Sequence, residues 1–151
     1  MNFTKMGMIV LNILADVLYD LLKQYRPNLP PRSDCDITYL YSEHRKLNKH
    51  IPSYSSFRRG PWGGNWQDIK ISDTATGDDI ERIRLTRNEL QHSRTFNLDD
   101  KRFNELCNII DHLLQRFDQR IKPASLYTDK LNETLAKTCS DDEVISIENE
   151  I

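Results

Sequence analysis

The sequence predicts an all-α protein: a helical bundle of four main helices, with a long irregular loop between the second and third helices. Three observations support this fold class. Apolar residues recur every three or four positions in several segments, which is the pattern of amphipathic helices. Proline and glycine residues gather between those segments, where they end helices and form turns. The length of 151 residues suits one domain that can bury a continuous core.

The first helix is expected over residues 4–24, because its apolar positions form one wide face. Thr4 is the expected N-cap. Prolines at 27, 30 and 31 end this helix and force an extended connection. The second helix is expected over residues 35–49, capped by Ser33 or Asp34. The apolar positions of the first helix are Met6, Ile9, Val10, Ile13, Leu14, Val17, Leu18, Leu21 and Leu22.

Residues 51–77 are expected to form the long irregular loop, because proline and glycine residues interrupt this stretch repeatedly. The segment contains two tryptophans, Trp62 and Trp66, with Arg58 and Arg59 beside them. Two interpretations of these side chains stay open. The tryptophans could clamp the loop onto the helices, as happens in loops packed by their own side chains. Alternatively they form a platform on which nucleic-acid bases stack.

The third helix is expected from Asp78 to about residue 93, with Asp78 as N-cap and Glu81 completing a capping box. The fourth helix has the clearest apolar stripe and ends before Pro123. These elements place a helical domain at residues 1–123. Residues 124–138 are expected to form an additional C-terminal helix, and residues 139–151 an acidic, disordered tail. The stripe of the fourth helix contains Phe103, Leu106, Cys107, Ile110, Leu113, Leu114, Phe117 and Ile121.

The composition limits the chemistry that this chain can perform. A formal net charge of −2 gives no overall attraction to nucleic acid, so RNA binding needs a local basic patch. The three cysteines lack CxxC spacing, which argues against a disulfide framework or a zinc site. No metal or other cofactor is expected. The apolar N-terminal stretch is too short and too charged to span a bilayer, so we expect a cytoplasmic protein without a membrane partner.

The most informative residues are Arg87 and His92, in the third predicted helix. Arg87 falls on the apolar stripe, about 80° or less from Ile83 and Leu90 on a helical wheel. A buried arginine needs an acidic partner or a bound anion, and Asp16 and Asp20 are the first candidates for that partner. His92 lies about 140° around the helix from Arg87. The two side chains can therefore converge only through a distorted last turn, at the rim of a cleft, or across a two-fold interface.

Arg87, Asn88 and His92 form an Arg-Asn-x-x-x-His motif, which resembles the active-site signature of the HEPN ribonuclease superfamily. The lead-in, Ser-Asp-Thr-Ala-Thr-Gly-Asp-Asp-Ile-Glu-Arg-Ile-Arg at residues 72–84, resembles the HEPN-like region of the DAZ-interacting zinc-finger ubiquitin ligases and their invertebrate relatives. The resemblance covers roughly residues 5–121, and its informative core is residues 66–92. RING zinc spacing is absent from this sequence, so ubiquitin transfer is not carried over.

The resemblance implies a homodimeric endoribonuclease that works without a metal and leaves a 2′,3′-cyclic phosphate. Histidine has the pKa for general acid–base catalysis near neutral pH, and arginine binds phosphate oxygens. His92 and Arg87 would take these roles, and Asn88 would orient the phosphate or the histidine. A second hypothesis also stays open: a non-catalytic module that dimerises, or binds RNA or signalling proteins, in stress or innate immune responses. The candidate RNA-binding residues are Arg58, Arg59, Trp62, Trp66 and Arg84.

Overall fold

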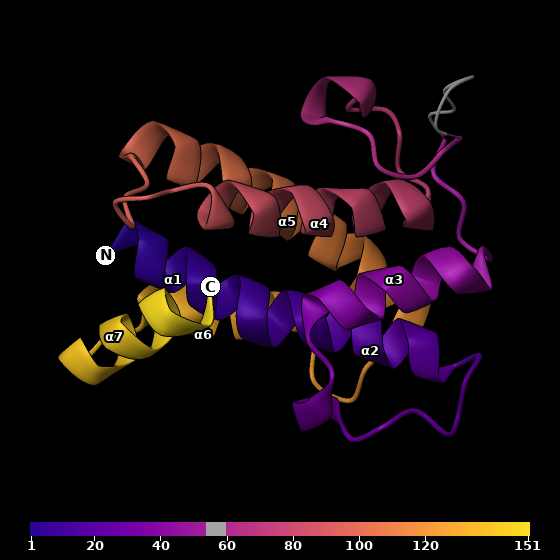
Figure 1. The fold of residues 1–151 in the computed structure, drawn as a ribbon, viewed down its shortest axis with the longest axis horizontal. Coiled ribbons are helices and arrows are strands. Elements are labelled where there is room, and N and C mark those ends of the chain that lie inside the picture. Colours follow the sequence, from indigo (N-terminus) through magenta and orange to yellow (C-terminus); the bar gives the residue numbers. More distant parts are fainter. Residues whose placement is uncertain (54–59) are drawn as a thin grey trace.

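The computed structural model describes residues 1–53 and 60–151, and the described chain is built from helices and connecting loops (Figure 1). The predicted all-α class is confirmed, and each of the four predicted main segments is helical. Figure 1 shows α4 and α5 side by side, above the layer that contains α1, α2 and α3. The elements are α1 (Asn2–Met8), a π-helical segment η1 (Ile9–Leu14), α2 (Ala15–Lys23), η2 (Arg32–Asp34), α3 (Ile37–Leu47), η3 (Trp66–Asp68), α4 (Thr76–Gln91), α5 (Asp100–Ile121), α6 (Tyr127–Ala136) and α7 (Asp141–Glu150).

The continuous helix made by α1, η1 and α2 is the centre of the core. Neighbouring helices cover it on several sides, since it contacts α3, α4, α5, α6 and α7. Six of the nine residues of α2 are buried as a result, and its charged residues Asp16, Asp20 and Lys23 lie on the more exposed side. The helix begins at Asn2, and Thr4 is buried within its first turns. The prediction that Thr4 caps this helix is therefore wrong.

Helix α3 begins after Asp36, whose carboxylate accepts the Tyr39 N–H at 2.8 Å. The N-cap is thus Asp36, and not the predicted Ser33 or Asp34. Within α3, the imidazole of His44 is 1% exposed, and its Nε2 lies 2.9 Å from the carbonyl oxygen of Leu18. Burial lowers the pKa of His44 to about 4. His44 is therefore a neutral core residue that ties α3 to α2.

Helix α4 begins two residues before the predicted start. Asp78 is its third residue, and the Asp78 carboxylate accepts the N–H of Ala75 at 3.1 Å. The same carboxylate accepts the backbone N–H and the hydroxyl of Ser53, at 2.7 and 2.6 Å. Asp78 therefore accepts a backbone N–H at the start of α4 and fastens the preceding loop to this helix.

Within residues 139–151, Asp141–Glu150 form helix α7, whereas the acidic composition predicted a disordered tail. Ser140 caps α7, and Glu143 completes a capping box with it. Ile147 is buried against α1, where Gly7 leaves the space for its side chain. The expected additional helix in residues 124–138 is present as α6. Figure 1 shows α7 and the N-terminus at the same end of the molecule.

Candidate functional site

Arg87 lies in the second half of α4, on the side that packs against α3. Its Nη1 donates a hydrogen bond to the hydroxyl of Thr38 at 2.6 Å. Its Nε is buried and has no hydrogen-bond partner among the residues that the structure describes. Burial lowers the pKa of the Arg87 guanidinium, the Asp36 carboxylate opposes that effect, and Arg84 adds to it. A buried cationic donor without a partner is costly, and a bound anion is one way to satisfy it.

The acidic partners expected for Arg87 are engaged elsewhere. Asp16 pairs with Arg32 at 2.8 Å, and Asp20 accepts the hydroxyl of Tyr127 at 2.5 Å. The prediction that one of these carboxylates would meet Arg87 is therefore wrong. Both aspartates lie on α2, whereas Arg87 faces the first turn of α3. A helical wheel shows which side of α4 carries Arg87. It does not show whether α2 or α3 packs against that side.

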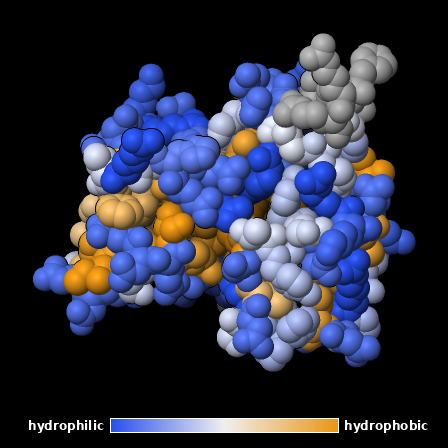
Figure 2. Space-filling model, in the orientation of Figure 1, coloured by the Kyte–Doolittle hydropathy of each residue, from blue (hydrophilic) through white to orange (hydrophobic). Residues whose placement is uncertain are grey.

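A cavity of about 120 Å³ lies beside Arg87. The first turn of α3 and the C-terminal end of α7 form its other walls, and Gln91 donates a hydrogen bond across it to the carbonyl oxygen of Ile151 at 3.4 Å. Figure 2 shows apolar surface deep between the two halves of the molecule and polar side chains around it. The cavity is lined by Leu11, Asp36, Ile37, Thr38, Arg87, Gln91, Glu150 and Ile151. Two carboxylates thus share this cavity with the arginine.

His92 follows the last residue of α4 and is exposed. Its backbone N–H donates to the carbonyl oxygen of Asn88 at 3.0 Å, which places Asn88 one turn earlier, in a half-buried position. His92 is not among the residues that line the Arg87 cavity. Within a single chain, the structure therefore does not bring the imidazole and the guanidinium into one pocket.

The candidate RNA-binding tryptophans differ in their surroundings. Trp62 is 7% exposed, its Nε1 donates to the Asn48 side chain at 3.0 Å, and its ring packs edge-on against Tyr41. Trp62 therefore clamps the loop onto α3, the first of the two interpretations. Trp66 is half-buried, and the guanidinium of Arg102 lies 5.3 Å from the centre of its ring. This cation covers one face of the Trp66 ring.

Of the three candidate RNA-binding arginines, Arg84 has a structural role. Arg84 pairs with Glu81 at 2.7 Å, lies 5.5 Å from the centre of the Tyr41 ring, and donates to the carbonyl oxygen of Gly64. It holds residues 63 and 64 to the helices together with Glu81, which also accepts the Gly63 N–H. Arg58 and Arg59 lie outside the described residues.

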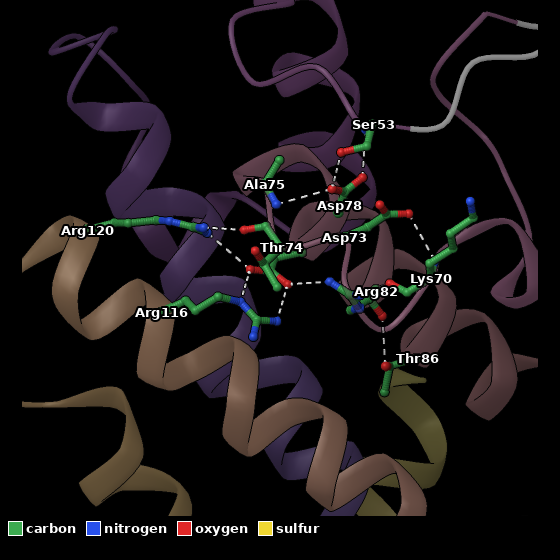
Figure 3. Close-up of polar contacts among 11 residues, drawn as sticks. Ser53, Lys70, Asp73, Thr74, Ala75, Asp78, Arg82, Thr86, Arg116 and Arg120 are labelled. Atoms are coloured by element: carbon green, nitrogen blue, oxygen red, sulfur yellow. Dashed lines mark hydrogen bonds and ion pairs between the residues drawn. The ribbon is translucent and has the colours of Figure 1, made fainter.

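A buried ion cluster, which no sequence pattern predicted, lies at the start of α4. Asp79 is fully buried, and its carboxylate pairs with Arg82 at 2.8 Å, with Arg116 at 2.8 and 2.7 Å, and with Arg120 at 3.1 Å. Figure 3 shows Arg116 and Arg120 reaching from one helix towards the segment around Thr74 and Ala75. The available signal was the spacing of the two α5 arginines, since residues four apart lie on one helical face.

The residues that the structure describes contain no group of three or more His, Cys, Asp or Glu side chains that could hold a metal ion. None of their helices combines the length and apolar character that crossing a membrane requires. No family model, no curated protein and no solved structure matches the chain. Any functional assignment therefore depends on the residues of this chain.

Proposed function

We propose that this chain is an HEPN-like cytoplasmic RNA endonuclease that works as a homodimer, with Arg87 as the phosphate-binding residue. One observation carries the proposal: the buried Nε of Arg87 has no partner in the described chain and adjoins a cavity. Arginine stays charged under all physiological conditions and its planar fork matches phosphate oxygens. An RNA phosphate bound there satisfies the donor that the protein leaves without a partner.

The geometry of α4 favours a site shared between two copies. Arg87 faces α3, whereas His92 is exposed beyond the end of α4. In a two-fold dimer, the same surface of both copies meets, so each exposed histidine can approach the arginine of the other subunit. The dimer then supplies a general acid–base beside each bound phosphate, which the isolated chain lacks.

The reaction follows from these residue types without a metal ion. A neutral His92 takes the proton of the 2′-hydroxyl, and the 2′-oxygen attacks the adjacent phosphorus. Arg87 stabilises the charge that develops on the phosphate oxygens. A protonated imidazole then donates a proton to the 5′-oxygen that leaves. The products are a 2′,3′-cyclic phosphate and a 5′-hydroxyl, and Asn88 helps to orient the phosphate or the imidazole.

A second candidate function is a non-catalytic module that dimerises and binds RNA or other proteins in signalling or innate immunity. The observation that favours it is the pair of carboxylates, Asp36 and Glu150, in the wall of the Arg87 cavity. Carboxylates oppose the approach of a phosphate and weaken its binding. This candidate predicts a stable dimer in light scattering that leaves RNA intact.

Cleavage of single-stranded RNA in EDTA tests the proposal. We expect the wild-type protein to cut. His92→Ala should cut at least about 100-fold more slowly, because general acid–base catalysis contributes about that factor or more. The melting temperature of His92→Ala is expected to be unchanged, since this side chain is exposed. His112→Ala, which removes an exposed histidine from α5, is the matched control and should cut normally. Equal cutting by His92→Ala and wild type would exclude the catalytic role.

A further inference from the structure

A second cavity, of about 350 Å³, lies between α5 and the segment around Ile71. It shares no lining residue with the Arg87 cavity. Arg82 and Arg116 form its cationic wall, and Asn108 and His112 contribute polar groups. Ile71 and Ile109 contribute apolar surface. Cavities of this volume that combine apolar walls with a few convergent polar groups are typical of small-molecule sites.

The two arginines are held in place before any ligand arrives. Asp79 pairs with both, and Arg82 also donates to the carbonyl oxygen of Lys70 at 3.0 Å. Arg116 uses its Nε and Nη2 on Asp79, while its Nη1 has no hydrogen-bond partner in the described chain. In Figure 3 one nitrogen of Arg116 points away from the cluster. Guanidinium groups that are already oriented lose little conformational entropy when they bind an anion.

The cluster beside this cavity holds more arginines than carboxylates that pair with them. Three arginines pair with the single carboxylate of Asp79. The neighbouring carboxylate of Asp78 is bonded to the neutral donors of Ser53 and Ala75, and its negative charge offsets part of this excess at Arg116. One carboxylate, Glu105, lines the cavity and opposes an anion, and it lies 3.7 Å from Arg102. A compact anion near the arginines avoids Glu105 better than an extended polyanion does.

One face of α5 adds polar side chains beside this cationic wall. Asn108, His112 and Arg116 are spaced four residues apart, so their side chains follow one another along the same face. On the other side, Ile71 is 97% exposed and lies at the rim of the cavity. An apolar group of a ligand would cover it.

We propose that this cavity binds a small organic phosphate monoester: the phosphate on Arg116 and Arg82, and the apolar group against Ile71 and Ile109. Asn108 and His112 contact the phosphate from α5. The proposal stands apart from the RNA chemistry of Arg87 and His92, because the two cavities have different walls. Each can therefore fail without the other.

Calorimetric titration with phenyl phosphate, using inorganic phosphate as the comparison, tests this site. We expect saturable binding of phenyl phosphate, with at least fivefold weaker binding of inorganic phosphate, which has no apolar group. Arg116→Gln should weaken the binding of phenyl phosphate at least tenfold. Arg120→Gln is the matched control, because Arg120 also pairs with Asp79 but does not line the cavity. This control should stay within twofold of wild type.

His112→Glu provides a variant that does not disturb the buried cluster, since His112 is exposed. The added carboxylate should abolish phenyl phosphate binding and leave both the melting temperature and RNA cleavage unchanged. No saturable binding to wild type, or unchanged affinity in Arg116→Gln and His112→Glu, would overturn the proposal. Displacement of phenyl phosphate by single-stranded RNA would also overturn it, because the cavity would then belong to a nucleic-acid interface.

Discussion

Asp79→Asn is expected to lower the free energy of unfolding by about 3–5 kcal/mol, the cost of removing one partner from a buried ion cluster. The side chain of Asp79 is fully buried and pairs with three arginines, one from α4 and two from α5. An asparagine of the same shape keeps the volume but removes the negative charge. The arginines are then left without compensation, and an amide N–H is turned towards guanidinium N–H groups. Thermal and chemical denaturation measure the loss.

The control for Asp79→Asn is Asp111→Asn, on the same helix that carries two of the arginines. Asp111 is partly exposed and accepts a hydrogen bond from Gln115 at 3.0 Å. This change should cost under about 1 kcal/mol, as exposed polar contacts do. Adding Arg120→Gln to Asp79→Asn should recover part of the loss, because it removes one uncompensated cation. A loss below about 1 kcal/mol for Asp79→Asn would contradict the role given to this cluster.

Gly77→Ala is expected to destabilise the protein by about 3 kcal/mol, at the upper end of the range for overpacked positions. A Cβ atom at Gly77 would lie 2.3 Å from the carbonyl oxygen of His50 and 2.5 Å from the backbone nitrogen of Pro52. These neighbours are backbone atoms, so relief requires a shift of the loop or of α4. We expect the melting temperature to fall by roughly 6–12 °C, because a chain of this size loses about 2–4 °C for each kcal/mol of stability lost.

Gly7→Ala is the matched substitution, because Gly7 is also a helical glycine with a neighbour 2.3 Å from the added Cβ. Here the neighbouring atom is the side-chain methyl Cγ2 of Ile147, on α7. A small shift of α7, the helix that carries Ile147, relieves this contact, and alanine also favours a helix by about 1 kcal/mol over glycine. Gly7→Ala should therefore cost much less than Gly77→Ala. Equal losses of stability in the two variants would show that the close approach of the loop backbone is not the reason for a glycine at position 77.

The helices could be predicted because their signal is local: the apolar period of the fourth predicted helix matches α5 closely. Helix α7 was missed because its composition is acidic, and because the contact between Ile147 and Gly7 joins distant parts of the chain. The capping box of Ser140 and Glu143 was present in the sequence and was the local signal to use. The acidic composition alone was a poor guide.

The polar lead-in at residues 72–84 has a structural explanation that the sequence did not reveal. Asp78 fastens a loop, Asp79 holds three arginines, and Glu81 accepts hydrogen bonds from Tyr41, Arg84 and Gly63. In sequence, these polar residues look like the first turns of a helix that faces solvent. Its burial depends on partners as far as 41 residues away along the chain, which a periodic pattern does not show.

The candidate site was predictable only in part. The sequence showed that Arg87 needs a partner, but it named Asp16 and Asp20, while packing against α3 supplies Thr38 and Asp36. The separation of His92 from Arg87 followed from the helical period and agrees with the structure, where the histidine is not part of the Arg87 cavity. Burial of Trp62 depends on the path of the loop, which no local pattern determines.

In the proposed dimer, Arg87 of one copy and His92 of the other act together on one phosphate. The direct measurement is RNA cleavage in EDTA by an equimolar mixture of Arg87→Ala and His92→Ala proteins, after dissociation and reassociation. Each variant alone should keep at most about 1% of wild-type activity. Random pairing makes about half of the dimers mixed, and each mixed dimer has one intact pair, so the mixture should regain about a quarter of wild-type activity. A mixture as inactive as its two components would contradict a site shared between subunits.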